Sequence, residues 1–260
     1  MIIDTHAHLD DKRYDNDLNE VIANAKASGV GGILIPGADI NDLDKARKIA
    51  HANENIYFAA GVHPYHHEQY DEKILREFLK DEKCIAVGEC GLDYSRLPDS
   101  KENKRAEKLS QEKVFKAHVV LAKSVKKPLI VHIRDASLDS KRVLLENGAK
   151  EIGGVLHCYN ASEHLLSLAD DGFYFGIGGV LTFKNAKNLV EILPKIPLDK
   201  LVVETDAPYL TPHPYRGKRN EPAYTNYIVE KIAHLLQKDK KNIEKIVLSN
   251  SKKLFKAFAK

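Results

Sequence analysis

Short apolar runs rich in β-branched residues alternate with longer amphipathic stretches along the whole chain. The runs have the length of buried strands, and the stretches between them place apolar residues at helical spacing. The predicted strands are Met1–His6, Gly31–Pro36, Ile56–Val62, Cys84–Glu89, Pro128–His132, Gly154–His157, Phe173–Ile177 and Leu201–Glu204. The predicted helices include Asp17–Ser28, Leu43–Ala52, Ala106–Val125, Leu138–Asn147 and Tyr224–Gln237. This repeated βα order predicts a (β/α)₈ TIM barrel, an α/β fold, rather than an open sheet.

No linker or low-complexity tract interrupts the pattern, so residues 1–260 are interpreted as one barrel domain. That length is close to the roughly 250 residues that such a barrel needs. The polar stretch Ser95–Arg105 is interpreted as a solvated loop, with a rim loop near the substrate as the alternative. The segment Lys252–Lys260 places three apolar side chains at helical spacing among lysines, which predicts a helix docked on the barrel rather than a membrane anchor.

Composition excludes several classes of protein. The net charge is only +3 and both signs are scattered along the chain, so no overall field indicates a protein that coats duplex DNA. Cys84, Cys90 and Cys158 form no CxxC spacing and are interpreted as buried thiols of a protein in a reducing compartment. The amino terminus lacks a signal-peptide pattern, and no apolar run approaches the roughly 20 residues of a membrane helix. We therefore expect a cytoplasmic monomer with no membrane partner.

Histidines or carboxylates stand at or just after the ends of six of the eight predicted strands. In these barrels the carboxyl ends of the strands display the catalytic residues, whereas the layers below are packed with apolar side chains. Histidines and acids thus have no packing reason to recur at these positions. In chain order the residues are His6 with His8, His63, Glu89, His132, His157 and Asp206.

All of these residues except His63 are predicted to hold two divalent cations. His6 and His8 lie two apart in an extended segment, so both rings point to the same face. Glu89 is predicted to join two half-sites, since a carboxylate has two oxygens and can bridge two cations. The first half-site consists of His6, His8 and Asp206, and the second of His132 and His157.

The donor set also limits the kind of metal. Mixed nitrogen and oxygen ligands suit Zn²⁺, Mn²⁺, Co²⁺ or Ni²⁺, with Mg²⁺ as an alternative. Neither half-site encloses its cation, and an open position is typical of a catalytic metal rather than a structural one. Glu204 shares the face of Asp206 and is a candidate to orient a ligand or to contact the substrate.

Several segments together resemble the TatD family of metal-dependent deoxyribonucleases, in the amidohydrolase superfamily. The resemblance spans nearly the whole chain and implies a (β/α)₈ barrel, a dinuclear site on the residues named above, and hydrolysis of DNA, often from the 3′ end of single strands. Glu89 stands where related superfamily members carry a carboxylated lysine, which favours TatD over urease-like and dihydroorotase-like enzymes. The matching segments are Asp4-Thr-His-Ala-His-Leu, Gly61-Val-His-Pro, Val87-Gly-Glu-Cys-Gly-Leu-Asp-Tyr, Pro128-Leu-Ile-Val-His-Ile-Arg-Asp-Ala, His157-Cys and Glu204-Thr-Asp-Ala-Pro-Tyr-Leu-Thr-Pro.

Catalytic roles can be proposed for three residues. Asp206 is expected to position the attacking water, and Glu89 to hold the two half-sites together. His63 is expected to offset charge on the phosphoryl oxygens, with a structural role in its His-Pro turn as the alternative.

The expected substrate contacts depend on phosphate and base chemistry. Arg134 follows His132 on the same face, and Arg216 lies with Lys218 and Arg219 in a loop after the eighth strand. Guanidinium groups match phosphate oxygens. Tyrosines near the strand ends could stack on unpaired bases, and these are Tyr94, Tyr159, Tyr209 and Tyr215.

Two other functions fit the same residues. A metal-dependent amidohydrolase or esterase could attack a carbonyl substrate such as D-aminoacyl-tRNA, because the same nucleophile can react at carbon. A non-catalytic protein could use the metals only to stabilise a binding surface, which predicts closed coordination and no turnover.

Overall fold

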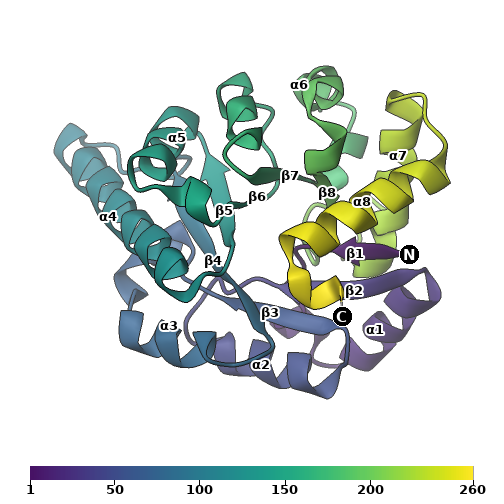
Figure 1. The fold of residues 1–260 in the computed structure, drawn as a ribbon, viewed down its shortest axis with the longest axis horizontal. Helices are drawn as coiled ribbons and strands as arrows, with labels where there is room; N and C mark the ends of the chain where they lie inside the picture. The colour runs from purple at the N-terminus through teal and green to yellow at the C-terminus, as the bar shows by residue number, and fades with distance from the viewer. Residues whose placement is uncertain (260) are drawn as a thin grey trace.

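The computed structural model describes residues 1–259, in which eight parallel strands follow one another around a barrel. Figure 1 shows the strands at the centre with helices around them. The barrel closes between its last and first strands through a parallel bridge from Ala7 to Ala207 and a hydrogen bond from the Thr5 N–H to the Val203 carbonyl. The predicted (β/α)₈ barrel is therefore confirmed. The strands are β1 (Ile2–Asp4), β2 (Val30–Ile35), β3 (Ile56–Ala60), β4 (Cys84–Asp93), β5 (Leu129–Arg134), β6 (Gly154–Leu156), β7 (Phe173–Ile177) and β8 (Leu201–Val203).

The helices cover the outside of this sheet. The α-helices are α1 (Leu18–Ala27), α2 (Leu43–Ala52), α3 (Glu72–Leu79), α4 (Lys101–Val125), α5 (Ser137–Glu146), α6 (Lys187–Ile192), α7 (Thr225–Leu235) and α8 (Lys240–Leu254). Between β6 and β7 a 3₁₀ segment, Glu163–Ala169, takes the place of an α-helix.

The start of α4 corrects the interpretation of Ser95–Arg105 as a loop, because helix begins at Lys101. Ser100 caps it, and its hydroxyl accepts a hydrogen bond from the Asn103 N–H at 3.2 Å. The first turns of α4 are exposed to solvent, so they carry no apolar periodicity from which a helix could be predicted.

Apolar side chains fill the interior of the barrel beneath the strand ends. Alternate residues of a strand point to opposite faces, so one residue from each of six strands contributes to this layer while its neighbours pack under the helices. At the opposite end Phe255 is buried against the same layer, and Phe258 packs beside it. The interior layer consists of Leu34, Ala59, Ala86, Ile130, Val155 and Val202.

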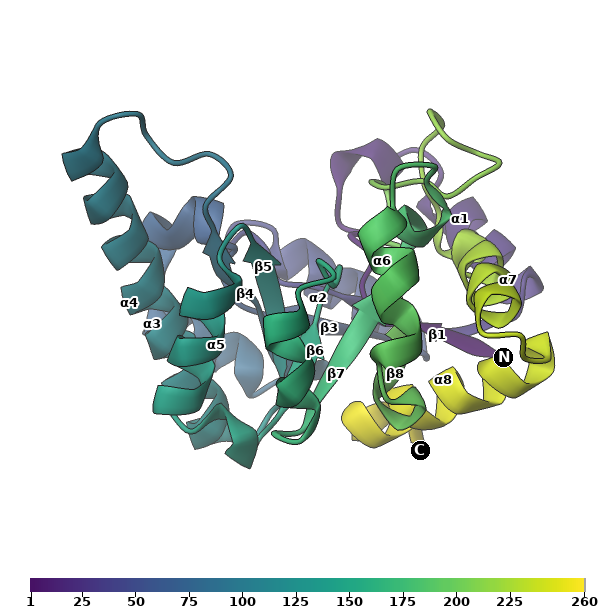
Figure 2. The ribbon, with the colours of Figure 1, turned by 90° about the horizontal axis from the view of Figure 1, so that it is seen from above.

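The carboxyl-terminal segment docks on the barrel as predicted, as far as the described residues extend. Helix α8 runs to Leu254, and a short 3₁₀ turn, Lys256–Ala259, follows Phe255. Figure 2 shows α8 close to the amino terminus of the chain, where Glu244 lies 3.8 Å from the Met1 amino group. Residue Lys260 of the predicted helix lies outside the described residues.

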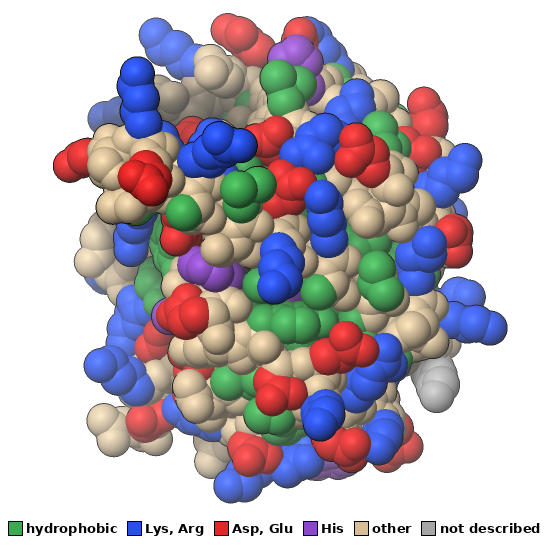
Figure 3. All heavy atoms as spheres, turned by 90° about the vertical axis from the view of Figure 1, so that its left-hand side faces the viewer, with side chains coloured by type: hydrophobic (Ala, Val, Ile, Leu, Met, Phe, Trp, Pro, Cys, Tyr) green, Lys and Arg blue, Asp and Glu red, His purple; other side chains and the backbone are tan. Residues whose placement is uncertain are grey.

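Within residues 1–259, no helix combines the length and the apolar character that crossing a bilayer requires. On the face shown in Figure 3, basic and acidic side chains are interspersed. This distribution agrees with the mixed signs along the sequence.

Candidate metal centre

A polar layer lies directly above the apolar interior of the barrel. Side chains two residues further along a strand point to the same side, so His132 follows Ile130, and His157 and Glu204 follow Val155 and Val202. His157 and Glu204 stand just beyond the ends of β6 and β8, and His132 lies two residues before the end of β5. The alternation that buries the core thus also directs these groups into the mouth of the barrel.

The closure of the barrel brings the chain after β1 against the chain after β8. The Asp206 N–H donates to the His6 carbonyl at 2.9 Å, and the His8 N–H donates to the Ala207 carbonyl at 2.7 Å. Asp206 has a φ of 56°, a left-handed conformation that aspartate tolerates better than most residues. His6, His8 and Asp206 therefore meet although about two hundred residues separate them in the chain.

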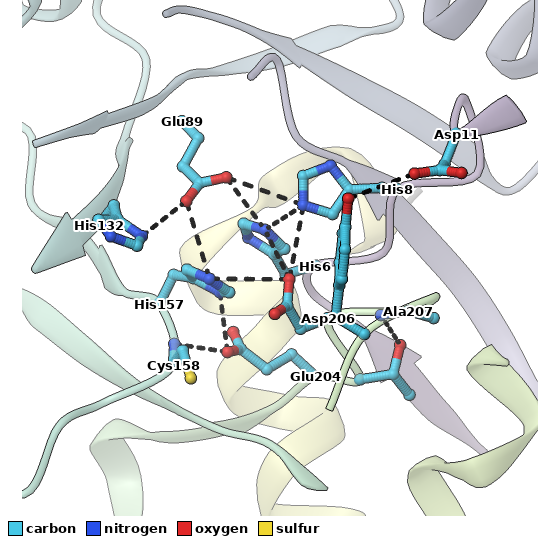
Figure 4. A network of polar contacts seen from close by, with 12 residues as sticks. His6, His8, Asp11, Glu89, His132, His157, Cys158, Glu204, Asp206 and Ala207 are labelled. Carbon is cyan, nitrogen blue, oxygen red and sulfur yellow. Dashed lines mark hydrogen bonds and ion pairs between the residues drawn. The ribbon is translucent and has the colours of Figure 1, made fainter. Parts of the chain in front are cut away.

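The first half-site gathers around one oxygen of Glu89 (Figure 4). Nε2 of His6 lies 3.4 Å from Glu89 Oε2 and 3.7 Å from Asp206 Oδ1. Nε2 of His8 lies 3.5 Å from the same Asp206 oxygen. These nitrogen and oxygen atoms point toward one another, so a single cation could contact all of them.

The second half-site gathers around the other oxygen of Glu89. Nδ1 of His132 lies 3.0 Å from Glu89 Oε1, and Nε2 of His157 lies 3.8 Å from it. The two oxygens of this carboxylate thus face different pairs of histidines. This is the arrangement that a carboxylate bridging two cations requires.

Two buried carboxylates lie behind the histidines of the second half-site. Glu204 Oε1 is 2.9 Å from His157 Nδ1 and accepts a hydrogen bond from the Cys158 N–H. Asp93 Oδ2 is 2.9 Å from His132 Nε2. Contacts of this kind orient metal-binding imidazoles and increase their basicity.

These positions revise two of the sequence interpretations. Glu204 is fully buried, so it supports His157 and cannot contact the substrate. Asp93 was missed because the fourth strand was predicted to end at Glu89, whereas β4 continues to Asp93. The sequence spacing could have identified Asp93, because it lies four residues after Glu89 and alternation in an extended chain places both side chains on one face.

The buried carboxylates of the centre favour positive charge on the groups next to them. Burial disfavours a protonated His157, but Glu204 and Glu89 raise its pKa to about 10. Burial has the same effect on His8, and Asp206 and Glu89 raise its pKa to about 9. Burial would raise the pKa of Glu89, yet His6 and His157 hold it well below its usual value.

The residues fit divalent cations. Ligand atoms of His6, His8 and Asp206 lie within 4.8 Å of one another, and those of His6, Glu89 and His157 do the same. Nδ1 of His6 is buried without a hydrogen-bond partner in the described part of the chain. Imidazole nitrogens with carboxylate oxygens are ligands that Zn²⁺ and its first-row neighbours prefer.

Comparison with known proteins identifies the family. The model of the family described as TatD related DNase matches residues 3–256. The chain belongs to the TatD related DNase family. This confirms the predicted family and, with it, the predicted class of enzyme, a metal-dependent hydrolase.

Individual relatives of the TatD family match over nearly their whole length. An uncharacterized metal-dependent hydrolase of Bacillus subtilis, YabD, is 41% identical, and the match covers 98% of this chain and 99% of that protein. The 3′-5′ ssDNA/RNA exonuclease TatD of Shigella flexneri is 33% identical, with 98% of each chain covered. The crystal structure of YJJV, a TatD homolog from Escherichia coli, superposes with a TM-score of 0.89 at 26% identity over 98% of both chains.

His63 caps a turn and also faces the centre. Its Nδ1 accepts a hydrogen bond from the Tyr65 N–H at 3.1 Å, which caps the turn after Pro64. Its Nε2 lies 3.7 Å from Glu89 Oε1 and faces the centre. Because Nδ1 accepts, the proton of the neutral ring lies on Nε2.

The arginines predicted to bind phosphate differ in their surroundings. Arg134 is exposed and lines the mouth of the centre. Arg216 is exposed, stacks over the Phe183 ring at 3.8 Å and donates to the Thr211 carbonyl. Arg219 instead pairs with Asp17 and Glu221, so its charge is already balanced within the fold.

Two of the tyrosines predicted to contact bases, Tyr159 and Tyr209, line a cavity beside the centre and differ in exposure. Tyr159 is only 4% exposed, packs edge-on against Phe175 and donates its hydroxyl to the Ser162 carbonyl, so its ring is fixed where it lines a cavity beside the centre. Tyr209 is 46% exposed and lies next to His8, with ring centroids 5.9 Å apart. Its exposed ring thus lies at the rim of the cavity.

Proposed function

We propose that this chain is an exonuclease that removes nucleotides from the 3′ end of single-stranded DNA, with two divalent cations, Zn²⁺, Mn²⁺, Co²⁺, Ni²⁺ or Mg²⁺, as cofactors. Membership of a DNase family and similarity to an exonuclease named for this polarity support the substrate and the direction. The observation that carries the proposal is the Glu89 carboxylate, whose two oxygens face two separate pairs of histidines. The cation ligands would be His6, His8, Glu89, His132, His157 and Asp206.

Bound divalent cations lower the pKa of a coordinated water and polarise the phosphoryl group, which is chemistry that the side chains do not supply by themselves. The side chains supply position and proton transfer. Asp206 is the better placed of the two central carboxylates for this task, because its side chain is 15% exposed and that of Glu89 only 3%. Burial would raise the pKa of Asp206, but contact with His8 lowers it, so the carboxylate is ionised and can accept a proton from the attacking water.

His63 acts on the phosphoryl oxygens as a neutral hydrogen-bond donor. Burial lowers its pKa to about 3, so the ring carries no charge at neutral pH. The Nε2–H group, directed at the centre while Nδ1 is fixed by Tyr65, can donate to an oxygen that gains negative charge as the reaction proceeds. His63 would therefore offset charge on the phosphoryl oxygens through a hydrogen bond from a neutral ring rather than through a positive charge.

Arg134 and Arg216 would bind the phosphates next to the scissile one. The Arg134 guanidinium lies at the mouth of the barrel beside His132, which places it closest to the reacting group. Arg216 lies on the loop after β8 and is fixed by Phe183, so it would meet the strand further away.

Digestion of end-labelled oligonucleotides tests the proposal. Purified protein loaded with Mn²⁺ or Zn²⁺ is incubated with single-stranded DNA labelled at its 5′ end, with a chelator control and with duplex DNA, RNA and aminoacyl-tRNA in parallel. We expect a ladder of progressively shortened single strands that the chelator abolishes. Release of the aminoacyl group without DNA cleavage would instead indicate the carbonyl reaction.

A further inference from the structure

Two cavities flank the metal centre and share several of its residues. One has a volume of about 560 Å³ and the other about 370 Å³. Both are lined by His132, His157 and Asp206, and by Arg134 and Tyr209 at the rim. A substrate whose scissile phosphate lies at the centre would therefore extend into both.

The smaller cavity carries the basic groups. Beyond the shared residues it is lined by Arg96, which lies over the Tyr65 ring at 4.6 Å, and by His63 and His66. Arg96 thus adds a second guanidinium group to that of Arg134, which both cavities share. This cavity suits a strand that carries a negative charge at every nucleotide.

The larger cavity is almost neutral beyond the shared residues. Apolar side chains of Val180 and Leu189 contribute to its walls, together with the amides of Asn160, Asn185 and Asn188. Its volume falls within the roughly 300–1,000 Å³ of cavities that enclose small ligands, which are typically apolar with a few polar groups.

The three asparagines are not equivalent. The Asn160 amide donates to the Ile133 carbonyl and the Ser137 hydroxyl, and its oxygen accepts from the Ser162 N–H, so it forms a fixed wall. Asn185 and Asn188 are exposed, and within residues 1–259 their amides make no hydrogen bond. An amide both donates and accepts, so it can pair with the edge of a nucleobase.

We infer that the larger cavity binds the base of the 3′-terminal nucleoside, with Asn185 and Asn188 on its edge and Val180 and Leu189 against its faces. The inference rests on the proposed exonuclease function and adds the direction of the strand. The terminal nucleoside carries no phosphate beyond the scissile one, so it suits the larger cavity, which is almost neutral beyond the shared residues. The rest of the strand carries a phosphate at every nucleotide and suits the smaller cavity, which Arg96 lines.

The test compares two single-stranded oligonucleotides that differ only in their 3′-terminal residue. One ends in an ordinary nucleotide and the other in an abasic sugar, and kcat/KM for removal of the terminal residue is measured on the metal-loaded enzyme. We expect the wild type to prefer the ordinary end by about tenfold or more, since contacts to one base commonly contribute this much. The double variant Asn185→Ala/Asn188→Ala should reduce this preference to about threefold or less.

Lys187→Ala is the matched control, because Lys187 is exposed on α6 between the two asparagines and does not line the cavity. It should keep the wild-type preference. The base site would be overturned if the wild type removed the ordinary and the abasic terminal residue equally well, or if the double variant kept the wild-type preference. Either result would leave the exonuclease proposal intact. Failure to cleave either oligonucleotide would instead refute the exonuclease function itself, and the base site with it.

Discussion

Replacing Glu204 by glutamine should weaken metal binding while the barrel stays folded. Glu204 Oε1 lies 2.9 Å from His157 Nδ1, and against the effect of burial its charge, together with that of Glu89, raises the pKa of that ring to about 10. When the ring loses one proton to bind a cation, this charge keeps the other proton on Nδ1 and leaves the lone pair on Nε2, which lies 3.8 Å from Glu89 and 3.9 Å from Asp206. Glutamine keeps the shape and can still accept from the Cys158 N–H, so the variant removes little except the charge.

The expected loss is about 10–100-fold in metal affinity, or about 1.4–2.8 kcal/mol, the usual effect of removing a carboxylate behind a metal-binding histidine. The dissociation constant for Zn²⁺ is measured by competition with a chromogenic chelator, and circular dichroism checks the fold. Glu191→Gln, on the exposed side of α6, is the control and should bind like the wild type. An unchanged dissociation constant in folded Glu204→Gln would refute the role of Glu204 behind His157.

Four further predictions follow from the same geometry. Asp206→Ala should abolish hydrolysis of single-stranded DNA without changing the circular dichroism spectrum, and turnover close to wild type would exclude its proposed role. Arg216→Ala should weaken DNA binding and reduce the slope of log affinity against log salt by about one, whereas an unchanged slope would count against a phosphate contact. Metal affinity should rise between about pH 6 and about pH 9, because His8 and His157, with pKa values of about 9 and about 10, must lose their protons to bind, and a flat titration would contradict this. Burial lowers the pKa of His118 from 6.5 to about 4, so the unfolded chain takes up a proton between these pH values that the folded chain does not. The free energy of unfolding should therefore fall by about 3 kcal/mol from pH 6.5 to pH 4, and a calorimetric series in which His118→Gln shows the same fall would refute the cause.

The barrel and the central residues could be predicted because one physical pattern determines both. Alternation along a buried strand gives the apolar layer, and the same alternation directs His132 and His157 into the mouth above it. Helix α2 was predicted with its observed bounds, Leu43–Ala52, because its apolar and polar faces are clearly separated.

Residues whose role depends on distant partners could not be assigned in this way. Arg219 has the same local sequence character as Arg216, yet it pairs with Asp17, which is 202 residues away. His118 lies in the middle of α4 and accepts a hydrogen bond from the Val62 N–H beside His63, and nothing in its local sequence indicates this contact. Only the closed barrel brings such pairs together.

The central claim is that two cations lie on either side of the Glu89 carboxylate, within reach of four histidines and Asp206. Anomalous diffraction from crystals grown with Zn²⁺ or Mn²⁺, combined with elemental analysis of the same protein, tests this directly. We predict two metal ions per chain, with two anomalous peaks flanking Glu89, one beside His6 and His8 and the other beside His132 and His157. A centre without peaks, or histidines that point away from the peaks found, would contradict the account.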